Sequence, residues 1–127
     1  MELNEITREI VDAAIKVHKL LGPGLLESAY KICLAFELRR RGLKVETEVA
    51  VPILYDGIVI DVGYRMDLLV EDQVPVELKA VSEIIPIFKA QLLSHLKLSN
   101  KRVGLLINFH VELLKDGIVR MANNMKS

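Results

Sequence analysis

Two acidic residues, Asp67 and Glu77, flank a short polar turn that separates two apolar stretches. If that turn is centred on Asp72, antiparallel pairing places Asp67 opposite Glu77. Directly opposed side chains on one face of such a pair have Cβ atoms about 4.5–5.5 Å apart. Two carboxylates at that separation repel each other, and a hard divalent ion such as Mg²⁺, which prefers carboxylate oxygens, relieves the repulsion. The spacing therefore predicts a metal site on a β-hairpin.

A basic residue, Lys79, follows Glu77 by two positions and so projects from the same face of the predicted strand. Beside a metal-bound carboxylate, its ammonium group could stabilise charge developing at a scissile phosphate, or could orient or help to deprotonate the attacking water. The simpler interpretation is a solvated strand face with a weak cross-strand ion pair. The metal-site interpretation depends on the register, because a slip of one residue would separate Asp67 from Glu77.

The hydrophobic periodicity on either side of this segment predicts the elements that position it. Apolar residues recur every three or four positions over residues 3–20 and again over about 26–41, which is typical of amphipathic helices. From Lys44 to Tyr55 the period is two, and Asp56-Gly57 is a two-residue hairpin signal. The elements expected after that turn are a strand over residues 58–70 with a bulge or bend at Gly63, a strand over 74–81, a helix over 86–98, and strands over 102–108 and 118–121. This order predicts an α/β sandwich built on a mixed sheet.

The composition of the 127-residue chain is that of one globular domain, with 51% hydrophobic and 27% charged residues. Seventeen Lys and Arg balance 17 Asp and Glu, so the chain lacks the positive excess of a general nucleic-acid binder. The charge is uneven, however. Four acids and no base lie from Asp67 to Glu77, whereas five bases and one acid lie from Lys79 to Arg102. A cluster of acids that can bind a metal, beside a basic segment, suits a phosphodiester substrate.

Other classes of protein are excluded or disfavoured by what the chain contains. The single cysteine, Cys33, excludes an internal disulfide and a multi-cysteine zinc site. With 5% aromatic residues and no Trp, a base-stacking surface is not expected. The first residues lack a signal-peptide pattern, and no apolar run approaches the ~20 residues that span a bilayer. We expect a soluble protein of a reducing cytoplasm with no membrane partner.

Two motifs resemble a known family. The pattern Asp67…Glu77-Leu-Lys79 resembles the PD-(D/E)XK nuclease motif, with Met66 in place of its Pro. The segment Gly24-Leu-Leu-Glu-Ser-Ala-Tyr30 resembles the signature of the GxxExxY proteins, a small prokaryotic family in that superfamily, and the similarity covers nearly the whole chain. The resemblance implies a single domain over residues 1–127. That domain would have an α/β restriction-endonuclease-like core, a mixed β-sheet flanked by helices in the order α-α-β-β-β-α-β-β.

The resemblance also implies a role for each matching residue. Asp67 and Glu77 would bind Mg²⁺ or Mn²⁺, and Glu27 would complete the site directly or through a water. Lys79 would be the catalytic lysine, and Gln91 is similar to an additional glutamine of the superfamily's site. His95 lies four residues after Gln91, on the same helix face, where family members tend to carry Tyr. The role of His95 is left open.

Three functions are compatible with these residues. The first is a metal-dependent nuclease that hydrolyses phosphodiester bonds in DNA or RNA. The second is a non-catalytic nucleic-acid-binding or protein-interaction module that retains the nuclease fold, in which a homodimer could form a groove. The third is an enzyme acting on another phosphorylated substrate. Two further polar residues have simpler interpretations: Tyr30 as a core aromatic, and His18 as a packing or capping residue, with contact to the site as its alternative.

Overall fold

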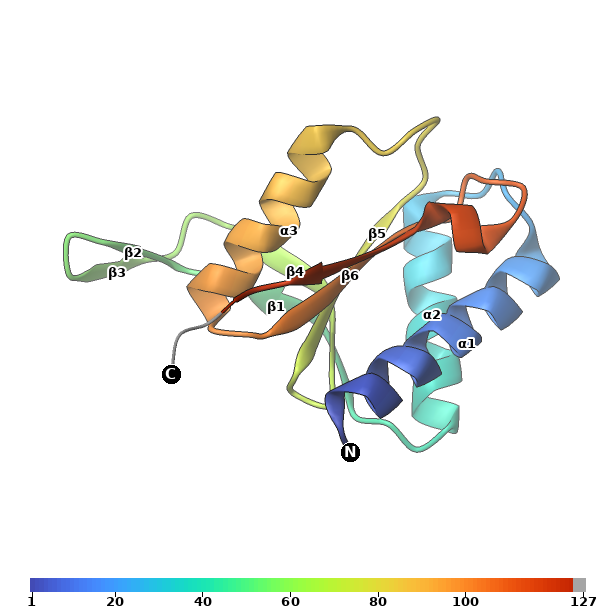
Figure 1. Ribbon diagram of the computed structural model, residues 1–127, viewed down its shortest axis with the longest axis horizontal. Coiled ribbons are helices and arrows are strands. Elements are labelled where there is room, and N and C mark those ends of the chain that lie inside the picture. The colour runs from blue at the N-terminus through green and yellow to red at the C-terminus, as the bar shows by residue number, and fades with distance from the viewer. Residues whose placement is uncertain (125–127) are drawn as a thin grey trace.

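A five-stranded mixed sheet forms the centre of the molecule, seen here in a computed structural model that describes residues 1–124 (Figure 1). In spatial order its strands are β1 (Val45–Ala50), β4 (Arg65–Val70), β5 (Val74–Lys79), β6 (Val103–Asn108) and β7 (Ile118–Ala122). β5 and β6 are parallel, and the other neighbouring pairs are antiparallel. The predicted α/β class with a mixed sheet is therefore confirmed.

Helices cover both faces of this sheet (Figure 1). α1 (Leu3–Leu21) and α2 (Glu27–Arg40) lie on one face, and α3 (Pro86–Ser99) lies on the other. Each agrees with its predicted range to within one residue at either end. Because helices cover both faces, all six residues of β6 are buried. None of the helices within residues 1–124 combines the length and apolar character that crossing a membrane requires.

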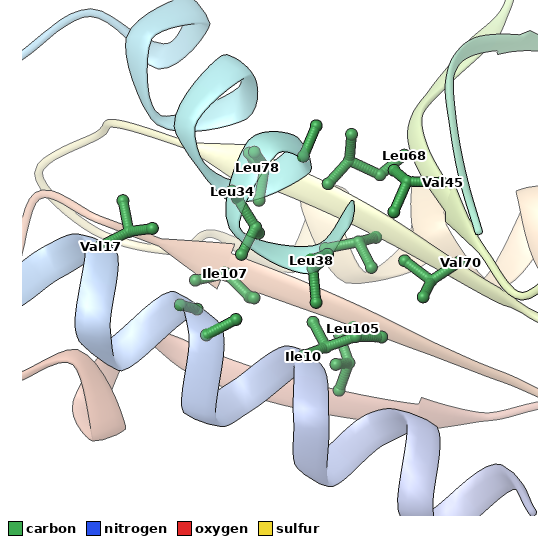
Figure 2. Packing of buried hydrophobic residues seen from close by; sticks show 14 of the residues in the cluster. Ile10, Val17, Leu34, Leu38, Val45, Leu68, Val70, Leu78, Leu105 and Ile107 are labelled. Carbon is green, nitrogen blue, oxygen red and sulfur yellow. The ribbon is translucent and has the colours of Figure 1, made fainter. Parts of the chain in front are cut away.

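The larger hydrophobic core lies between the sheet and the pair α1 and α2 (Figure 2). Aliphatic side chains at helical spacing on both helices pack there against alternate residues of the strands. The residues labelled in Figure 2 include Ile10, Val17, Leu34, Leu38, Leu68, Leu78, Leu105 and Ile107. This packing fixes which residues of β4 and β5 face the opposite side, because neighbours along a strand alternate.

Two polar aromatic residues belong to this core. Tyr30 stacks on Phe109 with ring centroids 4.4 Å apart, and its hydroxyl donates to the carbonyl of Gly22 at 2.6 Å. His18 is buried, and its Nε2 lies 2.8 Å from the carbonyl oxygen of Val111. Both residues therefore have the packing roles that their sequence context favoured, and His18 is tied to the core by its hydrogen-bonding contact.

The segment that precedes β5 holds four strands, where the alternating pattern predicted two. The predicted strand from Lys44 to Tyr55 ends at Ala50 and begins again as β2 (Ile53–Tyr55). Pro52 accounts for the break, because proline has no backbone N–H for a ladder and restricts the residue before it.

The predicted strand over residues 58–70 is also divided, into β3 (Ile58–Ile60) and β4. Between them the chain bends at Gly63, which has a positive φ of 88°, and the N–H of Gly63 donates to Asp61 Oδ1 at 2.9 Å. β2 and β3 form a separate two-stranded sheet around the predicted Asp56-Gly57 turn. This hairpin extends away from the rest of the molecule (Figure 1).

α3 approaches β6 closely because Gly104 has no side chain. A Cβ atom at Gly104 would lie 3.0 Å from both Leu92 Cδ1 and Leu96 Cδ2, and 3.2 Å from the carbonyl oxygen of Pro75. Leu92 and Leu96 are fully buried against Leu106 of β6. This close contact sets how near the polar residues of α3 come to the neighbouring strand β5.

A network of ion pairs joins α1 to the end of α2. Glu37, whose side chain is 8% exposed, accepts from Arg41 Nε at 2.9 Å and pairs with Lys16 at 3.2 Å and with Arg40. Arg41 also pairs with Asp12 at 2.7 Å. Hydrogen bonds, first from Arg41 and then from Lys16 and Arg40, lower the pKa of Glu37 to about 2. The basic end of α2 is therefore used to anchor α1.

Candidate metal and catalytic site

Asp67 and Glu77 lie together where the ladder between β4 and β5 ends. The last pair of that ladder is Leu68 with Val76, in the predicted register. Asp67 and Glu77 are the next residues along the two strands, so their carboxyl groups are neighbours and the charge of Asp67 acts on Glu77. The backbone N–H of Leu78 donates to Asp67 Oδ2 at 2.8 Å, which holds that carboxylate between the strands.

Glu77, like Asp67, is half-buried, and its side chain is 13% exposed. Its Oε1 lies 3.4 Å from Nδ1 of His95, which reaches it from α3. Burial raises the pKa of Glu77, the contact with His95 opposes that rise, and the charge of Asp67 adds to it. The ring of Tyr64 lies against His95, with centroids 5.8 Å apart. His95 is thus a neighbour of the candidate metal ligand, a contact that its spacing of four from Gln91 did not by itself reveal.

Lys79 lies on the same face of β5 as Glu77, as the spacing predicted. Its Nζ lies 4.6 Å from the centroid of the Phe88 ring, within the range of a cation–π contact. Lys79, Glu77, Gln91 and His95 all line one groove of about 870 Å³, between β5 and α3. The structure therefore brings Gln91 to the same surface as Glu77 and Lys79.

Glu27 approaches the pair from the first turn of α2. Its carboxylate interacts electrostatically with Asp67 and with Lys79, although the residue as a whole is exposed. Partial burial and the charge of Asp67 raise the pKa of Glu27, while Lys79 and Lys31 lower it. The charges of Asp67 and Lys79 therefore both act on Glu27. Glu27 is not among the residues that line the groove within residues 1–124.

A second acid–base pair, Glu48 and Lys31, lies beside these residues and was not singled out by the sequence. The neighbouring residues of Glu48 in β1 pair with Leu68 and Met66, so Glu48 lies across from Asp67. Glu48 lines the groove and forms an ion pair with Lys31, one helical turn after Glu27. The φ of Glu48 is 54°, which interrupts the regular strand. The sequence alternates through Glu48 without interruption, so it shows no sign of this break.

The paired carboxylates fit a hard divalent cation. Within residues 1–124 no group of three or more His, Cys, Asp or Glu side chains is arranged to enclose a metal ion. Mg²⁺ does not require such a cage, because it is usually held by one or two carboxylates, with waters and substrate phosphates as its other ligands. Asp67 and Glu77 supply that set of oxygens. A cation there would also relieve the repulsion that contributes to the raised pKa of Glu77.

The fold and these residues define a nuclease-like protein: carboxylates on adjoining strands, a lysine two residues after the second, and helices on both faces of a mixed sheet. The family model of the PD-(D/E)XK nuclease superfamily matches residues 4–121, and the chain belongs to that superfamily. No curated protein and no solved structure matches it. The finer resemblance to the GxxExxY proteins stays a prediction.

Proposed function

We propose that this protein hydrolyses phosphodiester bonds of DNA or RNA in a reaction that depends on Mg²⁺ or Mn²⁺. The observation that carries the proposal is how three side chains, Asp67, Glu77 and Lys79, are placed in a chain that belongs to a nuclease superfamily. Glu77 lies beside Asp67 of the neighbouring strand and lines, together with Lys79, a groove of about 870 Å³.

Asp67 and Glu77 are the residues that would hold the metal, with Glu27 contributing directly or through a water. When bound, the metal polarises a phosphate oxygen and lowers the pKa of a coordinated water. The hydrogen bond from Leu78 orients Asp67 before any ligand arrives. The contact with His95 favours the ionised form of Glu77, which is the form that binds cations.

Lys79 provides donors and positive charge at the position where charge develops on the phosphate. Its cation–π contact with Phe88 restrains the flexible side chain beside Glu77. Gln91 lines the same groove, where its amide group can orient a water or a phosphate oxygen.

The groove also carries positive charge that suits a polyanion. Lys97 lines it in addition to Lys79, and so does Arg65, which is paired with Asp61 at 3.1 Å. The acids of the same lining are Glu48 and Glu77. Phosphate contacts from such residues position a nucleic acid without reading its sequence. This distribution supports a nucleic-acid substrate despite the formal net charge of zero.

The direct test is a cleavage assay on labelled single- and double-stranded DNA and RNA, with Mg²⁺, Mn²⁺ or EDTA. We expect metal-dependent cleavage that falls by about 10²–10³-fold in Lys79→Ala, the cost of removing one donor to a developing charge. Lys89→Ala is the matched control, because Lys89 is exposed on α3 and is not among the residues lining the groove.

Cleavage by Lys79→Ala at the wild-type rate would contradict the proposed mechanism. Binding of nucleic acid without cleavage in any metal would favour the non-catalytic module. Hydrolysis of small phosphorylated compounds, with no response to polynucleotides, would favour the third function.

A further inference from the structure

The β2–β3 hairpin exposes an unusual amount of apolar surface for a free monomer. Five large apolar residues, two directly before its turn and three directly after it, are exposed; Tyr55 and Val59 are each 69% accessible. The exposed members are Leu54, Tyr55, Ile58, Val59 and Ile60. The hairpin lies apart from the five-stranded sheet and extends from the body of the molecule (Figure 1). Contiguous apolar patches of this kind usually mark interaction sites.

A two-stranded hairpin by itself is at best marginally stable in water, and three or more strands are needed for independent stability. Within residues 1–124, β2 and β3 are paired only with each other. Each therefore has an outer edge of backbone N–H and C=O groups without a strand beside it. Pairing of one such edge with another strand would supply the missing neighbours.

The charge around the hairpin indicates what kind of partner can cover it. From Val45 to Tyr64 the chain has four acidic residues and no Lys or Arg. Three of these acids are paired with bases: Glu46, Glu48 and Asp61 with Lys44, Lys31 and Arg65, respectively. The hairpin itself is therefore an apolar surface without a basic residue of its own to contact phosphates. A protein strand of matching apolar character is the partner that this surface fits.

We propose that the partner is a second copy of this chain, paired antiparallel along β3 about a two-fold axis at Val59. That register places Ile58 opposite Ile60 of the other copy, so every facing pair in β3 is apolar. It also places Asp61 opposite Gly57, so no two acids face each other. The two hairpins then form one four-stranded sheet.

The outer edge of β2 is a poorer candidate for the same pairing. Pro52 precedes β2 directly and offers no N–H to a partner strand, a feature that protects sheet edges from association. No proline lies between Gly57 and Val62, on the side of β3. This inference is independent of the proposed nuclease activity, because none of the residues in the proposed β3 pairing belongs to the candidate metal site.

The first experiment measures mass by light scattering over a range of protein concentrations. We expect wild type to reach twice the 14.3 kDa of the chain. Val59→Lys should stay monomeric, because two ammonium groups would face each other across the axis. Ile32→Lys is the matched control: Ile32 is 67% exposed on α2, and this variant should dimerise as wild type does. Circular dichroism checks that both variants are folded.

A second experiment locates the axis. In a Cys33→Ala background, Val59→Cys should form a disulfide-linked dimer on mild oxidation. Directly opposed residues in antiparallel strands have Cα atoms about 4.5–5.5 Å apart, within the range of disulfides. Ile32→Cys in the same background should not cross-link. A wild-type protein that is monomeric at every concentration would overturn the proposal, as would a dimer that survives Val59→Lys.

Discussion

The carboxylate of Asp67 accepts a hydrogen bond from the backbone N–H of Leu78, at 2.8 Å, just beyond the end of the ladder between β4 and β5. One side chain thus satisfies a backbone donor and at the same time presents its charge beside Glu77. Its structural and chemical roles can be separated, because the first needs only an acceptor and the second needs a negative charge.

Asp67→Asn should keep the acceptor and lose the charge, whereas Asp67→Ala loses both. We expect Asp67→Asn to unfold in urea much as wild type does in EDTA, but to lose the rise in Tm that Mn²⁺ produces. Asp67→Ala should lose about 1–3 kcal/mol of stability, because the Leu78 N–H is left without a partner. Asp72→Asn, in the exposed turn, is the control and should retain both properties. Equal stability of the Ala and Asn variants would count against the role of this hydrogen bond.

Glu77→Gln should raise the stability of the metal-free protein at neutral pH. Burial raises the folded-state pKa of Glu77, so the ionised side chain disfavours the folded state. The stability that the protonated Glu77 contributes to wild type is fully present below the pKa of the group in the unfolded chain. It is lost as the pH rises through the pKa of the group in the folded protein. The advantage of Glu77→Gln in EDTA should therefore grow with pH.

Saturating Mg²⁺ or Mn²⁺ should reverse that order, because only wild type binds the ion. A ligand at a hundredfold excess over its Kd stabilises the folded state by about 2.7 kcal/mol. Thermal unfolding with and without metal measures both effects. Glu83→Gln, at an exposed position, should shift neither. A Glu77→Gln protein that is less stable than wild type in EDTA at neutral pH would contradict the prediction.

His95→Ala should weaken metal binding without preventing folding. The contact with His95 lowers the pKa of Glu77, so its removal raises that pKa further and lets protons compete better with the metal. Losing a partner of a metal ligand typically costs about 10–100-fold in affinity. Calorimetric titration with Mn²⁺ measures the change. Ser94→Ala alters the same groove without touching Glu77, and its affinity should match wild type. An unchanged Kd in His95→Ala would show that the contact is incidental.

Glu37 should make the fold sensitive to acid. The pKa of Glu37 is lowered to about 2 in the folded protein. The stability that its ionised form contributes is therefore present above the pKa of the group in the unfolded chain, and it is lost as the pH falls towards the pKa in the folded protein. Wild type should therefore be more stable than Glu37→Gln near neutral pH, and the gap should narrow below about pH 4.5. Urea unfolding at several pH values measures the gap, with Glu112→Gln as an exposed control. A gap of constant size down to pH 3 would contradict this account.

Local patterns in the sequence determined much of the framework. The three helices follow from runs of apolar residues at spacings of three and four, and from breakers such as Gly22 and Pro23. The register of Asp67 and Glu77 follows from a single tight turn, because a short turn fixes the pairing of both strands that it joins. The spacing of Glu77 and Lys79 placed them on one face of their strand, and the family resemblance pointed to Gln91, but the groove that all three line was not predicted.

Tertiary structure alone decided the features that depend on distant pairings. The contact of His95 with Glu77 requires α3 to lie at a given height over β5, which Gly104 and the packing of Leu92 and Leu96 set. Glu48 reaches the site only because β1 pairs with β4, a pairing that no local pattern specifies. A bend at Gly63 was expected from the sequence, but the alternation continues through Pro52, and only the structure shows that β2 and β3 leave the sheet. Periodicity reports which face of an element is buried, but the partner that buries it is chosen by packing across the whole chain.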